Sequence, residues 1–289
     1  MSNIAWDSQN YSKHFSYVAD YGQPLIDMID KREGMTCLDL GCGNGRLTEK
    51  LKEAGLDVTG MDDSAAQIQK AKEDHNGIRF VQGNACDFSL AEPVDAVFSN
   101  AVFHWIDESR QPDMLRCVYR ALKPGGQFVF EMGGKGNNAL IHGSLRRAFE
   151  RRGLEYHFPF FFPSIGEYAS LMENAGFLVR MAILFDRKTR LDGDDGLHDW
   201  IRMFVKAPFD GIAAAEAEAI IREAVEELRP RLCEDGVWYA DYVRLRCKAV
   251  VQGLAPGMVE TGLQECNPET PGLSVIKIEP VLVTGKRGQ

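Results

Sequence analysis

The sequence predicts an α/β protein built around a doubly wound, seven-stranded and mostly parallel sheet. Short apolar runs alternate with helical patterns between residues 36 and 132. Alternation of this kind is typical of parallel strands that are joined by crossover helices. A glycine-rich turn, Gly41-Cys-Gly-Asn-Gly45, directly follows the first apolar run. Such a turn lets the chain pass from a buried strand into a helix and lets the backbone approach a ligand closely.

The elements before and after this turn follow from local signals. Apolar residues at helical spacing between residues 6 and 31 predict two short helices, the second of them opened by Pro24. Ser64 is a good N-cap, and Ser164 with Glu167 fits a capping box whose helix ends at Gly176. The predicted strands are 37–40, 58–61, 78–81, 95–100, 127–132, 178–185 and 242–251, and further helices are predicted from about 44 and at 64–72, 112–122 and 193–235. Residues 123–126 have the composition of a turn.

The overall composition excludes several classes of protein. The 289 residues are 45% hydrophobic and 26% charged, as in an ordinary globular protein. The formal net charge of -9 argues against nucleic acid as a partner, because contacts to a phosphate backbone come mostly from Lys and Arg. The seven cysteines form no C-x-x-C pair, so we expect neither a disulfide framework nor a metal site. No run is long enough to span a membrane and the N-terminus lacks an apolar signal core, so we expect a cytoplasmic location.

Two acidic residues accompany the glycine turn and indicate a nucleoside ligand. Asp39 lies in the first strand, and Asp62 ends the second apolar run, 21 residues after Gly41. A carboxylate at that point can accept both hydroxyls of a ribose. A dinucleotide fingerprint would have a third glycine where this chain has Arg46. An NAD-type oxidoreductase is therefore a disfavoured alternative.

Five later segments have patterns of their own: SNAVFHW (99–105), EMGGKGN (131–137), DRKT (186–189), WIRM (200–203) and WYADYVRLR (238–246). With these segments and the glycine turn, residues 6–251 resemble the class I S-adenosyl-L-methionine (SAM) methyltransferases, and among them the trans-aconitate methyltransferase-like branch. The resemblance implies a Rossmann-like fold, SAM as the cofactor, and transfer of a methyl group to a small-molecule acceptor.

The resemblance also implies which residues hold the cofactor. It places the glycine loop against the methionine part of SAM, Asp62 on the ribose with Asp63 as the neighbouring alternative, and Tyr11 on the carboxylate unless it is a packing aromatic. Many relatives have Gly-Asp-Ala where this chain has Gly-Asn84-Ala85, so Asn84 and the next backbone N–H would contact the adenine. The full set expected at the cofactor is Tyr11, Asp39, Gly41, Cys42, Gly43, Asp62, Asp63, Asn84, Ala85, Asn100 and Ala101.

The acceptor is expected where the fourth strand ends. Ligands of open α/β sheets bind beyond the carboxyl ends of the strands, and residues 100–105 leave the sheet there. His104 is therefore a candidate contact to the acceptor, with a packed pair between His104 and Trp105 as the alternative. The aromatic run Phe158–Phe162 is a candidate pocket wall.

Arg202 is a second candidate acceptor residue, because its neighbours in 200–204 are apolar or aromatic. An arginine directed into the pocket could clamp a carboxylate with two parallel hydrogen bonds. The alternative is an exposed arginine that pairs with an acid such as Asp199.

The chemical class of the acceptor stays open at this stage. A carboxylate is already ionised at neutral pH and needs no base. A phenol or an amine would require His104, His14 or Tyr11 to take a proton. A carbon acceptor and a catalytically silent SAM-binding module are further alternatives.

We expect a division into a core and a helical lid inserted around the last strands. Residues 1–132 would form the SAM-binding core, 133–163 and 190–236 the lid and substrate region, and 164–189 with 237–251 the rest of the core. The tail 252–289, rich in glycine, proline and polar residues, has no assigned role. A basic run in the lid is expected to be a solvated helix face; it contains Arg146, Arg147, Arg151 and Arg152.

Overall fold

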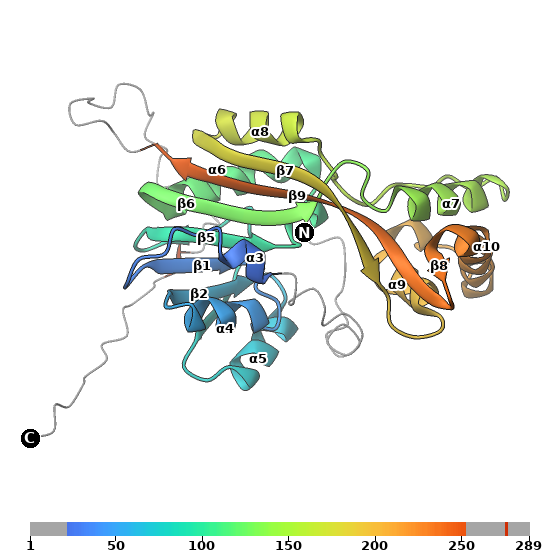
Figure 1. Ribbon diagram of the computed structural model, residues 1–289, viewed down its shortest axis with the longest axis horizontal. Helices are drawn as coiled ribbons and strands as arrows, with labels where there is room; N and C mark the ends of the chain where they lie inside the picture. Colours follow the sequence, from blue (N-terminus) through green and yellow to red (C-terminus); the bar gives the residue numbers. More distant parts are fainter. Residues whose placement is uncertain (1–21, 253–274, 277–289) are drawn as a thin grey trace, which may run out of the picture.

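The computed structural model describes residues 22–252 and 275–276, and its central feature is one open sheet (Figure 1). The strands are β1 (Thr36–Leu40), β2 (Asp57–Asp62), β3 (Arg79–Gln82), β4 (Ser89–Leu90), β5 (Val94–Asn100), β6 (Leu122–Gly133), β7 (Phe177–Arg190), β8 (Cys233–Glu234), β9 (Val237–Val251) and β10 (Val275–Ile276). The main sheet has the order β3-β2-β1-β5-β6-β9-β7, with β8 paired to β9. All strands from β3 to β6 are parallel along this order, and β9 runs antiparallel to both β6 and β7. The predicted mostly parallel sheet is therefore confirmed, with the short β8 as an additional strand.

Helices cover both faces of this sheet. They are α3 (Gln23–Ile26), α4 (Arg46–Glu53), α5 (Ala65–Asp74), α6 (Gln111–Ala121), α7 (Ala139–Glu150), α8 (Ile165–Asn174), α9 (Gly196–Phe204) and α10 (Ala214–Leu232), with 3-10 turns η1 (Phe103–Trp105), η2 (Glu108–Arg110) and η3 (Ala207–Phe209). Side chains of α6 and α8 pack in one core with Phe128 and Phe130 of β6. Those of α3 and α4 pack in a second core with Phe98 and Val129, whose side chains point to the other face. The result is the doubly wound layering that the alternating pattern predicts.

A separate apolar core lies where β7 and β9 extend beyond the rest of the sheet, at the right of Figure 1. It joins α7, α9 and α10 to the far ends of the two strands through residues of 141–156 and 191–242. These helices come from the segments expected to form the lid. Because β7 and β9 pair continuously out to Arg190 and Tyr239, this part of the molecule is attached to the sheet by unbroken strands.

Several element boundaries differ from the sequence prediction. β7 and β9 are longer than predicted because they hydrogen-bond to each other well beyond the region that β6 supports. Residues 123–126, expected as a turn, lie inside β6 and interrupt its pairing with β5. Val94 of β5 pairs with Leu122, and Ala96 already pairs with Gln127. The short strand β4 was not predicted. It pairs with β10, which lies in the tail.

The local helix signals are confirmed. The Ser64 side chain accepts a hydrogen bond from the backbone N–H of Gln67 at 3.3 Å, and α5 begins at the next residue. Ser164 and Glu167 form the complete capping box of α8. Gly176 follows the C-cap residue of α8, Ala175, and its φ of +99° directs the chain away from the helix.

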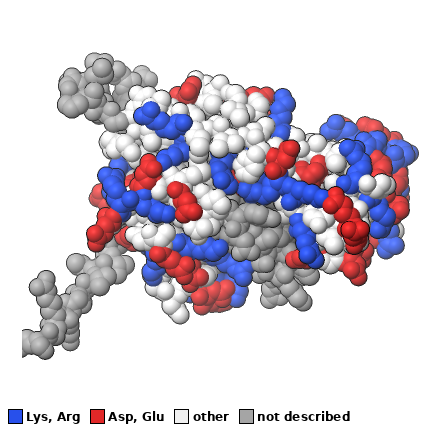
Figure 2. All heavy atoms as spheres, viewed as in Figure 1, with Lys and Arg blue, Asp and Glu red and all other residues white. Residues whose placement is uncertain are grey.

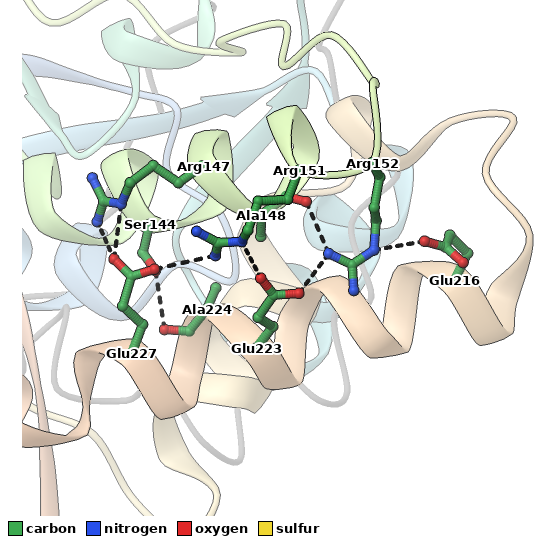
Figure 3. A network of polar contacts seen from close by, with 9 residues as sticks. All are labelled: Ser144, Arg147, Ala148, Arg151, Arg152, Glu216, Glu223, Ala224 and Glu227. Atoms are coloured by element: carbon green, nitrogen blue, oxygen red, sulfur yellow. Dashed lines mark hydrogen bonds and ion pairs between the residues drawn. The ribbon is translucent and has the colours of Figure 1, made fainter.

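The basic run on α7 is not simply a solvated face, because it binds a row of glutamates on α10 (Figure 3). Arg147 contacts Glu227, Arg151 contacts both Glu223 and Glu227, and Arg152 contacts Glu216 and Glu223. Pairs this exposed contribute little individually to stability, but a row of them fixes the register of the two helices.

The six cysteines in the described part of the chain are all free thiols. No group of His, Cys, Asp or Glu in residues 22–252 could hold a metal ion. None of the helices built from these residues is long and apolar enough to cross a membrane.

Candidate active site

The glycine loop and Asp62 are tied together at the carboxyl ends of β1 and β2. These strands are parallel neighbours, with Leu40 opposite Met61, so the loop after one lies beside the last residue of the other. Asp62 accepts hydrogen bonds from the backbone N–H groups of Gly43 and Ser64, each at 2.9 Å. One carboxylate thus fixes both the loop and the start of α5. Its remaining lone pairs are available to hydroxyl groups of a ligand.

The loop has the shape of a cradle, as the surroundings of a Cβ atom added to its glycines show. At Gly45 the added atom would lie 2.7 Å from the Phe80 ring, so this glycine is needed for packing. At Gly43, where φ is +53°, the added atom would meet nothing within 4 Å among the residues that the structure describes. The backbone of Gly43 is therefore open on its outer side, as a loop that receives a cofactor must be.

Asp39 lies beneath this cradle as a buried acid. Its Oδ2 accepts a hydrogen bond from the Thr48 hydroxyl at 2.6 Å. Burial raises the pKa of Asp39 to about 7; the Thr48 hydrogen bond opposes the shift and the charge of Asp62 adds to it. Burial also raises the pKa of Asp62, against the effect of its two backbone N–H donors. Two neighbouring carboxylates of this kind favour a ligand with a positive charge.

The other expected cofactor residues lie nearby in different roles. The Cys42 side chain is buried in a small core with Phe80, so only its backbone faces the loop. Asp63 is exposed, and its backbone oxygen accepts from Gln82. The Asn84 Oδ1 atom accepts from the backbone N–H of Cys86 at 2.8 Å, which leaves its amide NH2 for a ligand. Ala85 is half-buried beside it.

Tyr11 and His14 lie outside the described residues. Asn100 is half-buried at the end of β5, and Ala101 follows it with a φ of 61°. The backbone N–H of Ala101 donates to the Glu131 carbonyl at 2.7 Å, which holds this left-handed turn and directs the chain into η1.

A pocket that is open to solvent on one side lies beyond the ends of β5 and β6. Its walls come from five separate segments of the chain. The lining residues are Ala101, His104, Trp105, Asn137, Asn138, Phe160, Phe162, Trp200, Phe204, Tyr242 and Arg244. This is the position where the sequence predicts the acceptor.

Aromatic rings form most of the pocket wall. Phe160 and Phe162 stack with centroids 5.2 Å apart, and Trp105 meets Phe160 edge-on at 4.7 Å. Trp200 of α9 donates a hydrogen bond from Nε1 to the Tyr242 hydroxyl at 2.7 Å. The predicted aromatic wall is confirmed for these two phenylalanines of the 158–162 run. A wall of aromatic rings is largely apolar and offers water few hydrogen-bond partners.

His104 is buried in this wall, between Trp105 and the two stacked phenylalanines. Its Nδ1 atom accepts a hydrogen bond from the backbone N–H of Gly133 at 3.2 Å. Burial, and then the charge of Arg244, hold the pKa of His104 well below its usual value of 6.5. The ring is therefore neutral at physiological pH.

Arg244 of β9 supplies the charge of the pocket. It is only 7% exposed, and its guanidinium lies over the Tyr242 ring at 4.4 Å. Glu131 lies 3.9 Å from its Nε atom. Both oxygens of Glu131 are already bound more closely by Arg187 and Arg246, at 2.6 Å each.

Three arginines thus share the single carboxylate of Glu131, and Arg244 is the one that lies farthest from it. Its Nε atom has no hydrogen-bond partner, and we find no other hydrogen bond of this guanidinium among residues 22–252. Figure 2 shows the wider setting, a band of Lys and Arg side chains across this face over β7 and β9. Sequence reasoning predicted a strand at 242–251 and assigned no role to Arg244. The available signal was that a strand in the interior of a sheet has both faces covered.

Arg202 does not reach the pocket, so its predicted role as a carboxylate clamp is not supported. Trp200 and Phe204 of α9 line the pocket, and a residue two positions from each lies on the opposite side of a helix. The Arg202 side chain is 61% exposed and binds Glu218 of α10 at 3.1 Å. The alternative of a surface arginine is correct, although its partner is Glu218 and not Asp199.

Comparisons with known proteins agree with this geometry. A family model described as "Methyltransferase domain" matches residues 38–130, from β1 into β6. An uncharacterized methyltransferase of Schizosaccharomyces pombe, C70.08c, is 32% identical over 253 residues, which are 83% of this chain and 96% of the relative. A trans-aconitate 2-methyltransferase of Azoarcus sp. is 30% identical over 129 residues, 44% of this chain and only half of that enzyme. A crystal structure assigned as a methyltransferase, from Bacillus halodurans, is 18% identical and covers 82% of this chain and 99% of its own, with a TM-score of 0.56, so it shares the fold.

Proposed function

This chain belongs to the class I SAM-dependent methyltransferases, and we propose that its acceptor is a small molecule methylated on a carboxylate oxygen. SAM is the cofactor and supplies a sulfonium methyl group. A carboxylate oxygen aligned with that methyl group would take it, and the electron pair of the broken carbon–sulfur bond would remain on sulfur. The reaction removes a positive charge and transfers no proton, so the protein mainly has to hold and align the acceptor.

The observation that carries this proposal is Arg244. A buried guanidinium without a close hydrogen-bonded acid is costly, because burial removes the water that would otherwise solvate it. A carboxylate in the pocket would accept two parallel hydrogen bonds from it and neutralise its charge. Glu131 cannot do so, because Arg187 and Arg246 already occupy its oxygens.

The composition of the pocket supports an acceptor that arrives ionised. The lining contains no Asp, Glu, Lys or Cys within the described residues. A carboxylate needs no proton removed, whereas a phenol or a protonated amine does. Two relatives match less than half of this chain, and the name of each contains that of an acid or its acyl group: trans-aconitate 2-methyltransferase and malonyl-[acyl-carrier protein] O-methyltransferase.

The cofactor side of the proposal assigns a role to each residue of the cradle. Gly41, Gly43 and the backbone of Cys42 would pack against the methionine part, and Asp62 would accept the ribose hydroxyls. The buried charge of Asp39 would favour the cationic end. Asn84 and Ala85 would contact the adenine, Asn100 and Ala101 would face the methyl group, and Tyr11 is proposed for the carboxylate.

The first test is a mass-spectrometric screen of small acids, phenols and amines with SAM. We expect a gain of one methyl group on acids, in products that mild alkali hydrolyses because they are methyl esters. Methyl ethers or methylamines as the only products would overturn the proposal. If S-adenosylhomocysteine forms with none of the compounds, the silent SAM-binding module becomes the better description.

The second test is Arg244→Lys, which keeps the charge but loses the planar fork. We expect kcat/KM for the acid to fall roughly 30-fold, a loss of about 2 kcal/mol of transition-state stabilisation, with SAM affinity unchanged. Arg202→Lys is the matched control, because Arg202 is exposed and bound to Glu218, and it should behave as the parent. Equal activity of Arg244→Lys and the parent would remove the clamp.

A further inference from the structure

We infer that His104 is a fixed hydrogen-bond donor that orients the acceptor through Nε2–H, and that it cannot act as the base of this site. The inference rests on the proposed function in one respect, namely that the pocket beside His104 holds the acceptor. The geometry of the ring is independent of which acceptor binds.

The backbone N–H of Gly133 decides which ring nitrogen carries the proton. A backbone N–H can only donate, so the Nδ1 atom that it meets at 3.2 Å must offer a lone pair. In a neutral imidazole the proton is then on the other nitrogen, Nε2. The neighbouring N–H, that of Gly134, is occupied by the Val243 carbonyl and does not compete for the ring.

Protonation of the second nitrogen is opposed by burial of the ring, by the Gly133 N–H and by the charge of Arg244. A proton on Nδ1 would face the Gly133 N–H directly. The packed groups around the ring are Trp105 of η1, Phe160 and Phe162, and Arg244 of β9, and the one charge among these is the positive charge of Arg244. The ring is therefore restricted to a single neutral form.

The Nε2 atom is available to a ligand. His104 lines the pocket, Nδ1 is turned toward β6, and we find no hydrogen-bond partner of Nε2 in the part of the chain that the structure describes. An oxygen of the acceptor can accept this N–H with one lone pair and keep another for attack on the methyl carbon. A base would need a lone pair at Nε2, which this tautomer lacks.

The tautomer can be measured without knowing the acceptor. The protein is labelled with 15N-histidine, and long-range proton–nitrogen correlation spectra are recorded from pH 5.5 to 8.5, with His104→Gln to assign the signals among the six histidines. We expect Nδ1 of His104 to have the shift of an unprotonated nitrogen, constant over this range. A protonated Nδ1, or a titration between these pH values, would overturn the inference even if acids prove to be the acceptors.

The orienting role is tested with the acceptor that the screen identifies. His104→Gln can present an amide N–H close to the position of Nε2, so we expect it to retain more activity than the apolar His104→Leu. The leucine variant should lose about 10- to 100-fold in kcat/KM at unchanged SAM affinity. Any rise of the parent's kcat/KM with pH, such as one caused by Asp39, should persist in His104→Gln. Full activity of His104→Leu, or a rise in the parent that is absent from His104→Gln, would contradict a fixed donor.

Discussion

Asp62 joins the cofactor cradle to the rest of the sheet, and replacing it by asparagine separates its two roles. The carboxylate accepts from Gly43 N–H through Oδ2 and from Ser64 N–H through Oδ1. Asparagine has nearly the same size but only one oxygen, so one of these two donors would face an NH2 group. The change also removes the negative charge that we propose as the ribose ligand.

The magnitude follows from these contacts. Replacing a charged acceptor of two ribose hydroxyls by a neutral amide should weaken SAM binding by about 1.5–3 kcal/mol, which is roughly ten- to a hundredfold in Kd. The cofactor-free protein should lose about 1 kcal/mol of unfolding free energy, because one backbone N–H loses its acceptor. This loss is at the lower end of the usual range, since the repulsion between Asp62 and Asp39 is relieved.

Calorimetric titration with SAM and thermal unfolding of the cofactor-free protein measure the two effects. Asp63→Asn is the control, because Asp63 is the adjacent acid and is exposed. We expect it to bind SAM as the parent does. If Asp62→Asn binds SAM within twofold of the parent while Asp63→Asn is weakened, the ribose contact belongs to Asp63 and the argument from strand register is wrong.

Two further predictions concern the cradle. Gly43→Ala should fold and yet not bind SAM, because the added Cβ enters open space and costs only about 1 kcal/mol of strain in the left-handed conformation. Gly55→Ala controls for that strain, since Gly55 has a φ of +91° and equally open surroundings, and retained SAM affinity in Gly43→Ala would contradict the cradle. For Asp39, burial raises the pKa in the folded state to about 7 from its usual 3.8, so the folded protein gains a proton before the unfolded chain does and is stabilised as the pH falls. When the pH is lowered from 8 to 6, the unfolding free energy of the parent should therefore rise by about 1.4 kcal/mol relative to that of Asp39→Asn. Chemical denaturation measures both free energies, and a difference between them that does not change with pH would refute the shifted pKa.

The features that the sequence by itself determined are those with short-range causes. The glycine loop, the acid at the end of β2 and the caps at Ser64 and Ser164 depend on hydrogen bonds between residues close in the chain or at the ends of adjacent parallel strands. Alternating apolar runs were enough for the layered sheet, because each run has to bury its face. The conformation of the glycine loop and the place of Asp62 beside it could therefore be predicted from the sequence, whereas the contacts of these residues to a cofactor stay predictions.

The acceptor side was decided by tertiary structure. Arg202 and Arg244 both have apolar or aromatic neighbours in sequence, yet one is exposed on α9 and the other is buried on β9. The difference arises because a helix has a solvent side, whereas β9 lies between two strands and is covered on both faces. The tautomer of His104 likewise depends on Gly133, 29 residues away. Charge and hydrogen-bond state in a pocket are set by whichever groups the fold brings within a few ångströms, and spacing along the chain carries no record of those distances.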